Sequence, residues 1–372
     1  MASSFEQFII EYSNKDELNS DNVGGHIHKQ IVMVNDDSYF YRKECASAES
    51  RHELPRPKTL DDCMMFDHLY KELQCGAHYS TYLNGLVNPQ DGSEPYYPHK
   101  VSCVLKRFAS EKEVKFRSER LYVDYNLSTL YNEVVGSRLI NAMGVDTVYN
   151  MPISSYPQYM LYEEYPRFDT VLSVDFMQGG YSYEDLRCLG LICFPNVFND
   201  QGMQELEDAL YKFGREHNIP NLDEQVKNVT KTLVEQILVK MLVCADTDMH
   251  QRNFMIKWRD GVDLGIAPCY DMELIFNNGE DSWLDFWLGV FRKQVKEEIF
   301  PYLSKKMPEL LDDFIARVKN LVRSGTLDKV MTESLPVPSE VYSKKLKYLH
   351  KQCDILEEEW IKTIIGAMQP DR

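Results

Sequence analysis

The first half of the chain carries short alternating patterns that are typical of β-strands. Apolar and polar residues alternate over residues 30–34 and 38–43, on either side of an Asn-Asp-Asp turn, which predicts a hairpin. The stretch "KVSCVLKRF" at residues 100–108 predicts a further strand, and residues 147–153 and 158–164 predict two more. We therefore expect the N-terminal part of the chain to be built mainly on a sheet.

One strong helical pattern lies among these strands. In "LSTLYNEVVGSRLINAMG", residues 127–144, the apolar side chains of Tyr131, Val135 and Leu139 share one face. Gly144 follows the last turn, where a glycine typically ends a helix. The pattern predicts one helix packed on the N-terminal sheet.

The second half of the chain is mainly helical in pattern. Residues 203–213 predict one helix, and a stripe of apolar residues over 226–241 predicts the next, with Asp223 as its N-cap. Similar stripes cover residues 310–321 and 342–364. The chain is therefore expected to divide near Tyr165.

Residues 45–98 differ from the rest of the N-terminal half. They contain five prolines and one helical pattern after Thr59, which indicates an insertion or a long decorated loop. The expected organisation is a first domain over residues 1–165 that carries this insertion, and a second domain over residues 166–372.

Composition and charge narrow the class of partner. The chain has 372 residues, of which 44% are hydrophobic and 27% charged, as in ordinary globular proteins. Its net charge of -17 disfavours nucleic acids and anionic membrane surfaces as direct partners. The nine scattered cysteines contain no Cys-x-x-Cys pair, which is typical of reduced thiols. With no signal peptide and no apolar run that could span a bilayer, we expect a cytoplasmic protein.

A set of oxygen-bearing side chains surrounds a predicted hairpin in the second half. Asp248, His250 and Asn253 follow the spacing D-x-H-x-x-N, and the strands of "FMIKW-RDG-VDLGIA" then lead to Asp271. An aspartate in this position can orient a hydroxyl for phosphoryl transfer. Asn253 and Asp271 offer the oxygen ligands that Mg²⁺ prefers, and the hairpin returns the second toward the first. The pattern favours an ATP-dependent phosphotransferase with Mg²⁺ over a surface hairpin with solvated charges.

Two assignments within this motif have alternatives. Asp246 is a rival for Asp248 as the catalytic aspartate, although it stands two residues too early for the spacing. His250 is a candidate general base, but a hydrogen-bonding role that shapes the loop is favoured, since kinase-type sites usually use the carboxylate.

For such a reaction, the first half of the chain must supply a loop that covers the nucleotide phosphates and a cation that neutralises their charge. The Gly24-Gly25 pair before Lys29 fits a loop whose backbone N–H groups face phosphate, although such a pair is more often a plain turn. Lys106 shares its predicted strand face with two apolar residues, which favours a fixed position over a solvated one. Glu133 on the following helix is placed to hold this lysine, with a solvent-facing charge as the alternative.

The remaining candidates are a second phosphate-binding lysine and a site for adenine. Lys43 also ends a predicted strand, but its neighbours Arg42 and Glu44 indicate an exposed strand end, so Lys106 is favoured as the phosphate-binding cation. Glu163 and Tyr165 end a strand at the expected domain boundary, where backbone groups can bind an adenine edge.

These motifs, taken in order, resemble the HipA-like serine/threonine kinases of bacterial toxin–antitoxin systems. The segments that carry the resemblance are "VGGHIHKQIVMV", "VSCVLKRF", "YNEVVGSRLINAMGVDTV", "MLYEEYPRFD", "ADTDMHQRNF" and "IAPCYDMEL". The resemblance implies an α+β, two-lobed protein-kinase-like fold with a β-rich N-lobe and an all-helical C-lobe. It also implies a protein substrate and an antitoxin-type partner.

Residue by residue, the resemblance implies Asp248 as the catalytic aspartate and Asn253 and Asp271 as Mg²⁺ ligands. It places Lys106 on the nucleotide phosphates, and Glu163 and Tyr165 at the adenine. The chain departs from the family in reaching its glycine loop almost at once and in its long insertion. Asn22 stands where such kinases commonly carry a self-phosphorylated serine.

Other functional classes remain open at this point. The D-x-H-x-x-N pattern also resembles small-molecule kinases of the aminoglycoside, choline and phosphoinositide types, although these usually carry an Asp-Phe-Gly-like metal site where Tyr270-Asp271-Met272 stands here. A kinase-fold binding module without catalysis is the further alternative. The complete set of Lys106, Asp248, Asn253 and Asp271 favours an enzyme.

Overall fold

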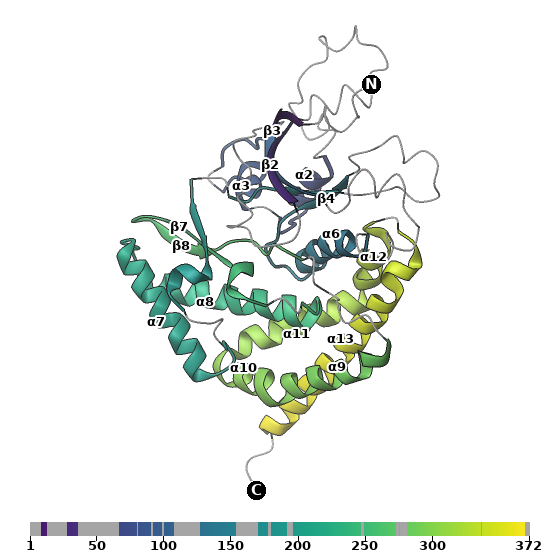
Figure 1. The fold of residues 1–372 in the computed structure, drawn as a ribbon. Helices are drawn as coiled ribbons and strands as arrows, with labels where there is room; N and C mark the ends of the chain where they lie inside the picture. The colour runs from purple at the N-terminus through teal and green to yellow at the C-terminus, as the bar shows by residue number, and fades with distance from the viewer. Residues whose placement is uncertain are drawn as a thin grey trace. The chain divides into compact units, whose positions relative to one another are not determined.

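The computed structural model divides the chain into two compact units (Figure 1). The first comprises Met1–Gly179 and Leu335–Val341, and the second comprises Gly180–Ser334 and Tyr342–Arg372. The residues that the structure describes are 9–12, 28–35, 67–79, 81–90, 92–98, 100–107, 127–153, 170–177, 180–191, 196–246, 249–272, 275, 281–335 and 337–368.

The first unit is built on a five-stranded antiparallel sheet with the order β1-β2-β3-β5-β4. Its strands are β1 (Ile9–Tyr12), β2 (His28–Asn35), β3 (Lys100–Arg107), β4 (Asn150–Ile153) and β5 (Thr170–Val174). The predicted strands around residues 30–34, 100–108 and 147–153 are therefore present, whereas those at 38–43 and 158–164 lie outside the described residues. Strand β3 lies centrally, with β2 on one side and β5 on the other.

The two faces of strand β3 have different surroundings. Val101 and Cys103 point into an apolar cluster that also contains Leu172 and Val174 of β5. Because side chains alternate along a strand, Lys106 belongs to the opposite face. That face is covered by helix α6 (Leu127–Ala142), which contacts β4 and β5 and is buried over most of its length. Gly144 follows the helix at φ +71°, as the sequence predicts for its C-terminus.

Part of the predicted insertion belongs to the core of the first unit. Residues 67–98 contain two helices, α2 (Asp67–Gln74) and α3 (Thr81–Val87), whose apolar side chains are buried in the same cluster as β3 and β5. Tyr79, between the helices, bridges to Thr147, and the Thr147 N–H donates to the carbonyl oxygen of His78 at 2.9 Å. The interpretation of residues 45–98 as an insertion stays a prediction, whereas the alternative of a long decorated loop is wrong for residues 67–98, because these two helices cover one face of the sheet.

We expect the replacement of Leu73 by alanine to lower the free energy of unfolding by about 2–5 kcal/mol, since its side chain is fully buried on α2. Lys71→Ala on the exposed side of the same helix is the matched control, with an expected change below about 1 kcal/mol. Urea unfolding of both variants measures the difference. Equal losses in the two variants would place α2 outside the core.

The second unit is mainly helical. Its helices are α7 (Asp200–Glu216), α8 (Leu222–Leu238), α9 (Asp281–Gln294), α10 (Phe300–Lys306), α11 (Pro308–Arg323), α12 (Thr326–Glu333) and most of α13 (Ser339–Met368). Short turns accompany them: the 3-10 turns η5 (Leu186–Leu189) and η7 (Gln251–Asn253), and the π-helical turns η6 (Val239–Val243) and η8 (Val295–Ile299). The predicted helices at 203–213, 226–241, 310–321 and 342–364 all lie within these elements. Asn221, rather than Asp223, precedes α8, so that Asp223 lies in the first helical turn.

A small antiparallel sheet, β6-β7-β8, completes the second unit. Strands β7 (Met255–Arg259) and β8 (Asp263–Ile266) form the predicted hairpin, with Gly261 in its turn at φ +68°. The additional strand β6 (Ser182–Asp185) pairs with β7. The α+β class is thus confirmed, with the correction that the second unit contains a sheet and is not all helical.

The division of the chain lies later than the sequence indicates. We expected it near Tyr165, but strand β5 pairs with both β3 and β4 and therefore belongs to the first unit. Residues 335–341 also belong to that unit, and Leu335 is fully buried. None of the helices in the described part of the chain is long and apolar enough to cross a membrane.

Candidate functional site

A buried lysine on β3 forms the centre of a polar network in the first unit. Lys106 is 6% exposed, and its Nζ lies 2.6 Å from Oε1 of Glu133, which is fully buried on α6. A charged pair removed from water is costly unless both members are satisfied by partners. The sequence left Glu133 open between a residue that holds Lys106 and a solvent-facing charge, and in the structure Glu133 is buried against Lys106.

The carboxylate is itself fixed by further hydrogen bonds. The side-chain amide of Asn150 on β4 donates to Oε2 of Glu133 at 3.1 Å and to its backbone oxygen at 2.8 Å. Ser173 on β5 donates its hydroxyl to the amide oxygen of Asn150. The network therefore ties β3, β4, β5 and α6 together around one cation. A lysine with a fixed position can act as a point charge toward a phosphate group.

The described part of the D-x-H-x-x-N pattern, residues 250–253 of the second unit, forms a short, capped turn. The ring Nδ1 of His250 accepts from the N–H of Arg252 at 3.1 Å and so caps turn η7. This contact fits the loop-shaping role favoured for His250. Asn253, the last residue of the turn, is buried at 4% exposure and directly precedes Phe254 and strand β7.

The segment that carries Asp271 returns to this turn. The backbone N–H of Ala267, just after β8, donates to the oxygen of Met255 at 2.9 Å, and the hydroxyl of Tyr270 donates to the oxygen of Arg252 at 2.5 Å. The hairpin therefore places the residues that flank Asn253 and Asp271 in contact, as its sequence predicts. Asp271 adopts φ +59°, a left-handed conformation that is uncommon outside glycine and is found often at functional sites.

A second buried lysine stands beside this segment. Lys240 is fully buried, and its Nζ lies 3.1 Å from Oδ2 of Asp246. Burial alone would lower the pKa of Lys240, but the carboxylates of Asp246 and Asp271 outweigh it and hold the pKa above its ordinary value. Asp246 is thus committed to an ion pair with a charged lysine. This contact favours Asp248 over Asp246 as the catalytic aspartate.

Several of the predicted site residues lie outside the described part of the chain. These are Gly24, Gly25, Lys43, Glu163, Tyr165 and Asp248, and residues 45–66 of the predicted insertion. The backbone of Lys29 is described in β2, where it pairs with Lys106 of β3. The roles predicted for these residues stay predictions.

Three residues were not identified from the sequence as parts of a site: two in the network around Lys106 and one beside Asp246. Asn150 and Ser173 lie on strands, where a polar residue gives no signal of its own. Lys240 lies in a helical pattern, where a lysine is usually a solvated charge. A signal for β5 was present in the β-branched run "TVLSV", which is typical of a strand.

The donor chemistry of Asn253 and Asp271 fits magnesium. Within the described ranges no group of three or more His, Cys, Asp or Glu residues is placed to hold a metal ion. Mg²⁺ typically takes only one or two protein oxygens and completes its shell with water and substrate phosphates. One amide and one carboxylate oxygen on two linked segments therefore suit a nucleotide-bound Mg²⁺ better than a cage made entirely by the protein.

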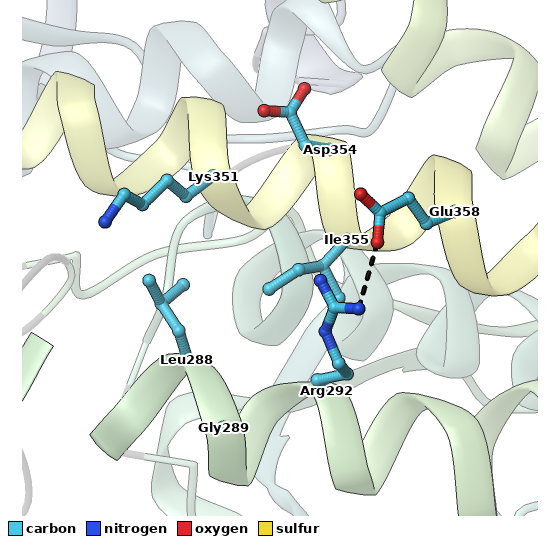
Figure 2. Close-up of a pocket in the computed structure, with 7 residues that line it drawn as sticks. All are labelled: Leu288, Gly289, Arg292, Lys351, Asp354, Ile355 and Glu358. Atoms are coloured by element: carbon cyan, nitrogen blue, oxygen red, sulfur yellow. Dashed lines mark ion pairs between the residues drawn. The ribbon is translucent and has the colours of Figure 1, made fainter. Parts of the chain in front are cut away.

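A groove of about 360 Å³ lies elsewhere in the second unit, between α9 and α13 (Figure 2). Arg292 on its wall lies 2.9 Å from Glu358 and 3.4 Å from the buried Glu359. Its lining carries Lys351 and Asp354 as a further cation and anion, so positive and negative charges are balanced. None of the predicted site residues lines this groove, and we assign it no ligand.

The described cysteines differ sharply in expected reactivity. Cys75 is exposed, whereas burial raises the pKa of Cys188 and of Cys353 to about 12 each. At pH 7 a thiol with such a pKa is thiolate in only ~10⁻⁵ of molecules, and the thiolate is the reactive form. We expect brief iodoacetamide treatment of the native protein, read by peptide mass spectrometry, to label Cys75 ahead of the other five described cysteines. Early labelling of Cys188 would contradict its raised pKa.

Comparison with known proteins finds similarity at the level of structure only. No protein-family model matches the chain, and no curated protein matches it by sequence. The solved structures similar to it include the Helicobacter pylori proinflammatory kinase CtkA, at 14% identity and a TM-score of 0.44, over 73% of this chain and 94% of that one. They also include HipA from Shewanella oneidensis, solved with HipB and operator DNA, at 11% identity and a TM-score of 0.44, over 73% of this chain and 61% of HipA. A HipA protein is thus among the structures that this chain is similar to, as its motifs led us to expect.

Proposed function

We propose that the chain is an ATP-dependent phosphotransferase, and that it transfers the γ-phosphate of ATP to a serine or threonine hydroxyl of a protein. The observation that carries this proposal is the buried pair of Lys106 and Glu133, held by Asn150. A phosphoryl group bears dispersed negative charge, so its transfer requires fixed cations and little covalent chemistry from the protein. A lysine held in a buried polar network is suited to that task.

The second unit supplies the other groups that this reaction needs. Asp248 would orient the attacking hydroxyl and accept its proton, and Asn253 and Asp271 would hold Mg²⁺. When bound, the metal neutralises charge on the nucleotide phosphates. The hydrogen bond from Tyr270 to the backbone of Arg252 keeps the two ligand-bearing segments together. Under this proposal, changes at Lys106 in the first unit and at Asp271 in the second impair the same reaction.

The test of the function is transfer of labelled phosphate from γ-labelled ATP to a cell lysate and to the protein itself. Phosphoserine and phosphothreonine found by mass spectrometry, and lost in Asp248→Ala, would support a protein kinase. Label found only on small molecules would instead support a kinase of the aminoglycoside or choline type. Nucleotide binding without transfer to any acceptor would support a binding module.

We extend this proposal to include a protein partner of the HipB type. The similar HipA structure contains HipB and operator DNA, and a protein partner of that kind would bring DNA to an acidic chain with a net charge of -17. The isolated chain is then expected not to retard random duplex DNA in a gel shift at low salt.

Metal dependence gives a prediction for the second unit. We expect Asp271→Asn to remove most of the Mg²⁺-dependent part of ATP affinity, because a neutral amide is a weaker ligand for a hard cation than a carboxylate. Calorimetric titration of ATP with and without Mg²⁺ measures that part. Asp263→Asn is the matched control, since Asp263 lies on the same hairpin and pairs with Arg259. Mg²⁺ dependence that survives in Asp271→Asn would exclude Asp271 as a ligand.

A further inference from the structure

Helix α8 ends in a π-helical turn that contains a fully buried cation. The turn spans Val239–Val243, and the N–H of Cys244 donates to the oxygen of Val239, five residues back. Such turns are rare and add one residue to the helical repeat, which redirects the side chains that follow. Lys240 lies in this turn and is 0% exposed.

The Lys240 side chain contacts three separate parts of the second unit. Its Nζ lies 3.1 Å from Oδ2 of Asp246, donates to the backbone oxygen of Tyr270 at 3.2 Å, and lies 5.3 Å from the ring centroid of Phe254. The Lys240 backbone oxygen also accepts from the N–H of Asp246 at 2.9 Å. Asp246 is therefore held by both the side chain and the backbone of one residue.

Each of these contacts stands next to a group that phosphoryl transfer would use. Asp246 precedes Asp248 by two residues, Phe254 follows Asn253, and Tyr270 precedes Asp271. We propose that Lys240 is a positioning residue, which sets the relative placement of Asn253 and Asp271 through its contacts with the neighbouring Phe254 and Tyr270. This role rests on the function proposed above.

The ion pair between Lys240 and Asp246 allows an experiment to distinguish a positioning role from a purely stabilising one. Replacing both members of a buried ion pair by apolar residues of similar size is often neutral or stabilising, whereas removing one member leaves an uncompensated charge. A well-packed apolar pair can therefore restore the fold without restoring the hydrogen bond to Tyr270 or the charge beside Asp271. Misplacement of reacting groups by about 1 Å can lower a rate by about 10²-fold.

The test compares single and double variants. We expect Lys240→Met to lower the thermal midpoint, and Lys240→Met/Asp246→Leu to return it to within about 4 °C of the wild type. In the double variant we expect phosphoryl transfer to remain about 10²-fold below the wild type and the half-saturating Mg²⁺ concentration to be raised. The shift in Mg²⁺ dependence is a readout that a purely structural role would not move.

The control is a second ion pair in the same unit, between Arg317 and Glu235. The double variant Arg317→Met/Glu235→Leu should keep wild-type transfer and Mg²⁺ dependence. If Lys240→Met/Asp246→Leu behaves in the same way, the positioning role is overturned while the kinase function stands. A wild-type protein that neither binds Mg²⁺–ATP nor transfers phosphate would instead overturn the proposed function, and with it the role of Lys240.

Discussion

Replacement of Asp248 by alanine is expected to lower phosphoryl transfer by ~10²–10⁴-fold, the usual contribution of a positioned acid–base group. The thermal midpoint and the affinity for ATP should stay near the wild-type values, because the change removes only the group that orients the attacking hydroxyl. Single-turnover transfer from labelled ATP measures the rate, and thermal unfolding measures the stability. Asp208→Ala on the exposed face of α7 is the control and should alter neither.

Asp246 provides the sharpest contrast to Asp248. Its carboxylate pairs with the fully buried Lys240, so Asp246→Ala leaves a buried charge uncompensated and should cost about 3–5 kcal/mol of stability. Loss of rate at constant stability in Asp248→Ala, and loss of stability in Asp246→Ala, would assign the two aspartates to different roles. Near wild-type transfer in Asp248→Ala would remove the assignment of Asp248.

The second large effect is expected at Lys106. Lys106→Met should weaken ATP binding and lower turnover by ~10²–10³-fold, since a fixed electrostatic donor to the transferred group is lost. The same change leaves Glu133 buried without its cation, which should cost about 3–5 kcal/mol of stability. A lower turnover in this variant alone would therefore have two explanations.

A double variant separates the two effects. In Lys106→Met/Glu133→Gln the neutral amide can still accept from Asn150, and most of the stability should return while ATP binding does not. Lys43→Met should change ATP affinity by less than tenfold, or ~1.4 kcal/mol, as measured with a fluorescent ATP analogue. If Lys43→Met were the impaired variant, the phosphate-binding lysine would lie on the strand predicted at residues 38–43 and not on β3.

Local patterns in the sequence were sufficient for some elements of this fold. Helix α6 follows from its helical spacing and Gly144, and the β7–β8 hairpin follows from alternation around a turn that contains Gly261. The position of Lys106 between apolar residues predicted a buried strand position, and the next helix supplied its carboxylate. In these cases the local spacing of apolar and polar residues is itself the signal.

Elsewhere the determining contacts leave no trace in the local pattern. Helices α2 and α3 are short, and their place in the core depends on strands β3 and β5. Lys240 carries no sign of burial, because a lysine near a helix end is ordinarily solvated. Its burial depends on the π-helical turn and on Asp246 and Tyr270, which only the folded chain brings to it.

The division of the first unit between two parts of the chain has a consequence for its folding during synthesis. Domains commonly fold as units in the order in which they leave the ribosome. Here Leu335 and Val337, both buried, belong to the unit that begins with the first residues. The first unit therefore cannot be complete until nearly the whole chain has emerged, and residues 180–334 are available to fold before it is finished. A nascent chain halted after Gly179 should protect its sheet from proteolysis less well than the full-length protein does.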